Sequence, residues 1–176
     1  MWDVAPIHPI HPSINKCANV NVAPIHLLAP IEPTHPSEYD EAEAPAREGL
    51  SIRRNLVGER HWNTALALDV LAETLTGLGR YREADPLYLQ AIDTYEETLG
   101  ADHHRTALCR QDYGLLLLKL GRYEDAEQKM LFGLQVLEED RARQETIRHL
   151  IELYETWGKP EKAAEYRAML LKEQSK

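Results

Sequence analysis

The sequence predicts an all-α fold, a solenoid of antiparallel helix pairs, and three observations lead to this prediction. Two short blocks of sequence recur with a common step of 42 residues. Apolar residues recur at helical spacing from about residue 38 onward. Eight of the ten prolines lie in the first 45 residues, which leaves the rest of the chain almost free of helix breakers. Repeats of 20 to 50 residues are typical of solenoids, in which each unit buries its apolar face against its neighbours.

The recurring blocks set the period. The block from Val57 to Leu66 returns from Leu99 to Leu108 with the same glycine, histidine, threonine, alanine and leucine positions. A second block keeps this step, since Gly79-Arg80-Tyr81-x-x-Ala84 returns as Gly121-Arg122-Tyr123-x-x-Ala126. Two interleaved blocks with one period indicate a repeat array and argue against a globular enzyme with a single site.

The first helices follow from this pattern in order. Ser37-Glu38-Tyr39-x-x-Ala42 matches the second block and opens a helix at about 38–55. The next helix, at about 64–78, has Thr64 as its expected N-cap and ends at Gly79. A helix at about 82–98 carries apolar residues at helical spacing, and Pro86 falls near its start, where a bend is tolerable.

The second half repeats the scheme. Thr106 is the expected N-cap of a helix at about 107–120 that ends at Gly121, and a helix at about 124–138 follows. The last two helices are expected at about 143–157, ending at Gly158, and at about 160–173, where Pro160 suits the first turn.

Composition excludes several classes of function. The net charge of −9 argues against nucleic acid, which needs a basic face, and against anionic membrane surfaces. No apolar run approaches the roughly 20 residues that span a bilayer, and the start of the chain lacks the pattern of a secretory signal. Cys17 and Cys109 suggest no disulfide framework. We therefore expect a cytoplasmic protein.

Residues 1–36 differ from the rest. They contain seven of the prolines and four of the eight histidines, so we expect an extended or disordered tail. Its apolar residues, among them Ile25, Leu27 and Leu28, lead us to expect that part of the tail packs on the solenoid. The histidines also leave open an alternative function, metal binding through this tail.

The helical part resembles tetratricopeptide repeats, in particular the 42-residue variety of kinesin light chains and many bacterial relatives. Ala72 and Gly114 match the small residue of the first helix, Tyr81 and Tyr123 the tyrosine of the turn, and Ala84 the alanine of the second helix. The resemblance covers about 37–176 and implies a half repeat at 37–63 and repeats at 64–105, 106–142 and 143–176. The asparagine of light-chain repeats is replaced, in the order of the repeats, by Val70, Asp112 and His149.

The resemblance implies a function and a surface. Such repeats are non-catalytic scaffolds that bind a protein or peptide on a concave face lined by first helices, without cofactor or metal. Transferring the family's positions gives nine partner-binding residues: Asp69, Glu73, Thr76, Gln111, Leu115, Leu118, Arg148, Glu152 and Glu155. Leu115 and Leu118 would then be exposed apolar anchors, although the Leu115–Leu118 run is equally consistent with core residues.

Two further expectations concern the chain as a whole. The helix near residue 38 lacks its partner helix, so we expect a monomer that is weak at this end, or a weak homodimer formed through the half repeat. An alternative function is also open: the chain is a detached or shortened regulatory region of a larger bacterial signalling protein, such as a Ser/Thr kinase.

Overall fold

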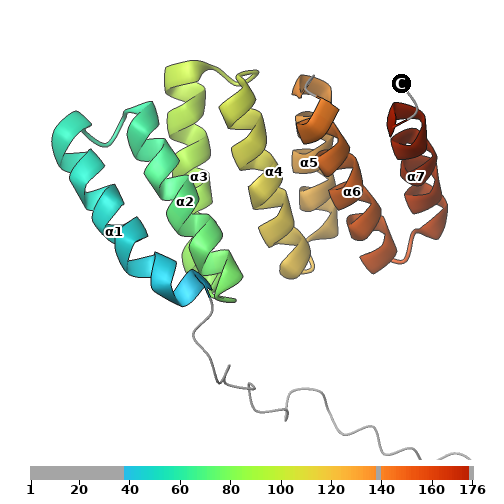
Figure 1. Ribbon diagram of the computed structural model, residues 1–176, viewed down its shortest axis with the longest axis horizontal. Coiled ribbons are helices and arrows are strands. Elements are labelled where there is room, and N and C mark those ends of the chain that lie inside the picture. The colour runs from blue at the N-terminus through green and yellow to red at the C-terminus, as the bar shows by residue number, and fades with distance from the viewer. Residues whose placement is uncertain (1–37, 138–139, 175–176) are drawn as a thin grey trace, which may run out of the picture. The chain divides into compact units, whose positions relative to one another are not determined.

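The computed structural model describes residues 38–137 and 140–174, and all regular structure in these ranges is helical. The seven helices, shown in Figure 1, are α1 (Glu38–Val57), α2 (Trp62–Gly77), α3 (Tyr81–Leu99), α4 (His104–Lys119), α5 (Tyr123–Val136), α6 (Asp140–Thr156) and α7 (Pro160–Gln174). The predicted all-α solenoid is confirmed for this part of the chain, and the tail at 1–36 lies outside the described residues. Within the two ranges, no helix has an apolar stretch of the length that a bilayer requires.

The helices pack in sequence order. Three antiparallel pairs form, α2 with α3, α4 with α5 and α6 with α7, and each pair contacts the next, while α1 packs on α2. The first helices of the pairs also touch in turn, α2 with α4 and α4 with α6. Figure 1 shows these three helices side by side, with α5 behind them. We call the surface that they share the α2–α4–α6 face.

Each pair turns on a glycine in the left-handed region. Gly79, Gly121 and Gly158 have φ angles of 73°, 73° and 74°, which side chains with a Cβ rarely adopt. In the first turn the N–H of Arg80 donates to the carbonyl of Leu75 at 2.8 Å, and the other two turns repeat this bond. The glycine ends predicted for these helices are therefore correct, including the one followed by Lys159-Pro160.

The predicted N-caps are wrong by three residues. His61 and His103 cap α2 and α4, since each Nδ1 accepts the backbone N–H two residues later at 3.1 Å. The hydroxyl of Thr64 instead donates to the carbonyl of Gly58 at 2.6 Å, and Thr106 does the same with Gly100 at 2.8 Å. The threonines thus fasten the preceding loop to the helix, and both helices begin earlier than expected.

The core lies between the two helices of each pair. Ala72 and Ala84 are fully buried, and a Cβ on Gly114 would lie 3.0 Å from Cγ of Met130. The small residues therefore allow the close helix approach that the repeat pattern predicts. Large side chains fill the remaining space, and Tyr88, Tyr95 and Tyr154 are almost completely buried.

Candidate functional site

A pocket of about 430 Å³ opens on the α2–α4–α6 face. Its walls come from all three helices, from the start of α1 and from α3. The lining residues are Tyr39, Glu73, Thr76, Gly77, Tyr81, Tyr88, Asp112, Leu115, Lys119, His149 and Glu152. Four of them belong to the predicted partner-binding set: Glu73, Thr76, Leu115 and Glu152. The structure therefore brings these four residues together, although Glu73 and Glu152 lie 79 positions apart in the sequence.

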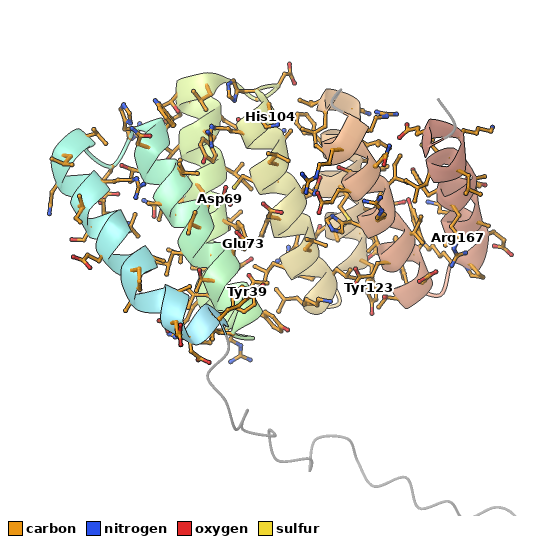
Figure 2. The ribbon with its side chains drawn as sticks, viewed as in Figure 1. Tyr39, Asp69, Glu73, His104, Tyr123 and Arg167 are labelled. Carbon is orange, nitrogen blue, oxygen red and sulfur yellow. The ribbon has the colours of Figure 1, made fainter. Side chains whose placement is uncertain are left out.

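Local packing fixes the aromatic side of this pocket. The ring of Tyr39 lies against Gly77, where a Cβ would come within 2.6 Å of the ring, so a larger residue at 77 would displace the tyrosine. Tyr88 is almost completely buried beneath the pocket, while Tyr39 and Tyr81 are half-buried. Figure 2 shows Asp69, Glu73 and Tyr39 following one another along this edge of the face.

Asp112 brings a carboxyl group without a basic partner to the pocket. It lies on α4 and interacts electrostatically with Asp69 and Glu73 of α2 and with Glu145 of α6. Burial raises the pKa of Asp112 to about 8, and the repulsion of these three carboxylates adds to the rise. Within the described residues, no hydrogen bond or ion pair stabilises its charged form.

Asp69 extends this acidic region toward the interior. Its pKa is raised to about 6, chiefly by burial and also by the charge of Glu73, although a side-chain hydrogen bond with Cys109 and the charge of Arg105 lower it. Its Oδ1 is buried and has no hydrogen-bond partner among the described residues. A buried carboxylate oxygen without a partner is unfavourable in the free protein.

Cations do little to neutralise the pocket. Lys119 is the one lysine or arginine among the lining residues, and its Nζ lies 3.2 Å from Oε1 of Glu152. His149 contributes no charge, because burial lowers its pKa, and its Nδ1 lies 3.2 Å from Nε2 of Gln111. The lining therefore carries three carboxyl groups and one lysine, and the lysine pairs with Glu152.

Two predicted residues lie in the interior. Gln111 is buried, and its side chain accepts a hydrogen bond from the hydroxyl of Thr146 on α6. Leu118 is only 4% exposed, so of the two alternatives for the Leu115–Leu118 run the core position is correct for this residue and the exposed anchor is wrong. The two residues lie seven positions apart and share a stripe of α4. This stripe faces α6, so packing between neighbouring first helices covers it, whereas Leu115 reaches the pocket.

The remaining predicted residues lie away from the pocket. Arg148 and Glu155 are exposed on α6, and Glu155 accepts a hydrogen bond from Arg167 of α7. The sequence prediction missed Asp112 and His149, which nevertheless occupy the column where light-chain repeats have asparagine. The third member of that column, Val70, is 45% exposed and lines a different, apolar pocket between α1 and α2.

The pocket offers both polar and apolar contacts. Its carboxylates accept hydrogen bonds, and its tyrosine rings and Leu115 offer apolar contact. Across residues 38–137 and 140–174, no group of three or more histidine, cysteine, aspartate or glutamate residues has the arrangement that would hold a metal ion.

Comparison with known proteins identifies the repeats. The sequence profile described as tetratricopeptide repeat matches residues 37–97 and 63–130. Repeats of this kind generally mediate protein–protein interaction and are typically non-catalytic. No curated protein matches the chain.

Solved structures share the fold. The crystal structure of BtubC (BKLC) from P. vanneervenii matches with a TM-score of 0.71 and 19% identity over 78% of this chain and 57% of that one. A putative kinesin light chain of Podosopora anserina with nearly identical TPR-like repeats matches with a TM-score of 0.69 and 17% identity over 78% of this chain and 67% of that one. A second crystal structure of the Podosopora protein gives the same values. The chain thus spans little more than half of BtubC.

Proposed function

Because this chain belongs to the tetratricopeptide repeat family, we propose that it is a non-catalytic interaction module that binds a peptide segment of a protein partner on the α2–α4–α6 face. One observation carries the choice of surface. The pocket on this face gathers four of the residues that the repeat pattern assigns to partner binding, and they come from three successive first helices. A segment that crosses the face would contact several repeats at once.

Site-specific crosslinking tests the surface. A photoreactive amino acid replaces Glu152, which is exposed and lines the pocket, in the full chain. The matched control carries the same group at Glu124, which is exposed on α5 and outside the pocket. After irradiation in an extract of the cells that produce the protein, we expect an adduct from position 152 and none from position 124. Equal adducts, or an adduct from position 124 alone, would contradict the proposal.

A further inference from the structure

We propose that the pocket on the α2–α4–α6 face receives a cationic side chain, lysine or arginine, from the partner's segment. This inference rests on the proposed function and specifies the chemistry of the same surface. Two features of the pocket support it: unpaired carboxyl groups on facing helices and a wall of tyrosine rings. A third observation comes from outside the lining, where Asp69 of α2 has a buried carboxylate oxygen without a partner.

The unpaired carboxyl groups are those of Glu73 and Asp112. They belong to α2 and α4, which contact each other, and both line the pocket. In the described part of the chain neither has a hydrogen bond or an ion pair with a basic group. Lys119 is engaged by Glu152 on the α6 side, so it does not serve the α2–α4 side. A cation bound between Glu73 and Asp112 would meet the charge of Glu73 and would favour release of the proton that Asp112 holds at neutral pH.

The acidic character extends from the pocket along α2. Oδ1 of Asp69 is buried without a partner, one helical turn before Glu73. The raised pKa of Asp112, about 8, has the same origin, since burial and three neighbouring carboxylates disfavour its charge. A bound cation would reverse this penalty and return the pKa of Asp112 toward its ordinary range.

The tyrosines suit the rest of such a side chain. Lysine and arginine carry an apolar stem that packs on apolar surface while the charged group remains hydrogen-bonded. Tyr39 and Tyr81 are half-buried at the pocket wall, and a guanidinium or ammonium group near a ring face gains cation–π attraction. An acidic segment would instead meet the carboxylates of Glu73 and Glu152, and the described residues offer no cluster suited to a metal ion.

Three peptides test the charge requirement on the full chain. The probe is a blocked six-residue peptide with two arginines, and its controls carry citrulline or glutamate at those positions. Citrulline keeps the shape of arginine and removes its charge. By isothermal titration calorimetry we expect the arginine peptide to bind at least tenfold more tightly than either control, and its affinity to fall as salt is added. An arginine peptide that does not bind, or that binds no better than the citrulline peptide, would overturn the inference.

Three variants locate the effect. The double variant Glu73→Gln/Asp112→Asn should weaken the arginine peptide at least tenfold, and Glu73→Gln alone, at an exposed position, should weaken it about threefold. Glu124→Gln removes one negative charge from α5 and should leave binding within twofold. Circular dichroism confirms that each variant is folded. If the double variant binds like the wild type, the inference is wrong. A crosslink at position 152 would still support the proposed function in that case.

Discussion

At the scale of single residues, Asp112 links the pocket to the stability of the fold. Its folded pKa is about 8, whereas an ordinary aspartate titrates near 3.8. Between these values the folded chain holds a proton that the unfolded chain has released. The stabilisation is therefore complete below about pH 4 and is lost as the pH rises toward 8. The raised pKa of Asp69 acts in the same direction, and the lowered pKa of His149 acts in the opposite one.

We therefore predict that Asp112→Asn reduces the loss of stability between pH 5 and pH 8. The asparagine carries no charge at either pH, so the variant should gain on the order of 2 kcal/mol relative to the wild type at pH 8. Urea denaturation at both pH values measures the difference, and Glu124→Gln serves as the control for the loss of one charge. An equal pH dependence in wild type and Asp112→Asn would contradict the assignment.

Leu118 and Leu115 provide a second prediction at this scale. Leu118 is 4% exposed and belongs to the core, whereas Leu115 is half-buried at the pocket. Truncating a buried leucine removes apolar contacts and leaves a cavity, so Leu118→Ala should destabilise the protein by about 2–5 kcal/mol. Leu115→Ala should lose less than half as much stability. Thermal denaturation of the wild type and the two variants measures both losses. Similar losses in the two variants would show that Leu115 is also a core residue.

At the scale of elements, the sequence predicts the helices better than the surfaces between them. The 42-residue step and the turn glycines reflect local backbone geometry, which a short segment of each repeat determines without its neighbours. The burial of Leu118 and Asp112, by contrast, depends on the neighbouring first helices. Leucine occupies all four positions from 115 to 118, which together make one full turn of the helix. Spacing alone therefore cannot identify the leucine that faces the pocket. The burial of Asp112 likewise requires α2 and α6 to be in place.

The caps give a prediction for a single element. His103 caps α4 through its Nδ1, which accepts the N–H of Arg105 at 3.1 Å. Alanine lacks an acceptor, so His103→Ala should destabilise the protein by about 1 kcal/mol, and His103→Asn should restore most of this loss because asparagine is a favoured N-cap. Chemical denaturation of the three proteins checks the order. If alanine and asparagine behave alike, the histidine cap does not stabilise the helix.

At the scale of the whole molecule, α1 is less covered by neighbouring helices than the corresponding helix α3. Among the described residues α1 contacts α2 and no other helix, and Leu50 is its one buried residue. Ala42, Ala46 and Gly49 line an apolar pocket between α1 and α2, whereas Ala84 and Ala91, one period after Ala42 and Gly49, are completely buried in the α2–α3 pair. Among the described residues, a first helix therefore covers this face of α3, whereas none covers the corresponding face of α1.

Stability in a repeat array is approximately a sum of terms from each repeat and from contacts between neighbours. We therefore predict that α1 opens more readily than α4, which contacts helices on both sides. In native-state hydrogen exchange of the full chain, backbone amides of α1 should be protected at least tenfold less than those of α4. Equal protection in the two helices would contradict this prediction.

The concentration dependence of the same measurement tests the weak homodimer expected through this end. Ile52, Leu56 and Val57 are exposed on α1, by 76% in the case of Leu56, and a second copy that covered them would bury apolar surface. A second copy that bound only while α1 is folded would stabilise α1 by mass action. Protection in α1 should then rise with protein concentration while protection in α4 stays constant. If α1 exchanges at one rate at all concentrations up to the millimolar range, this face does not mediate pairing.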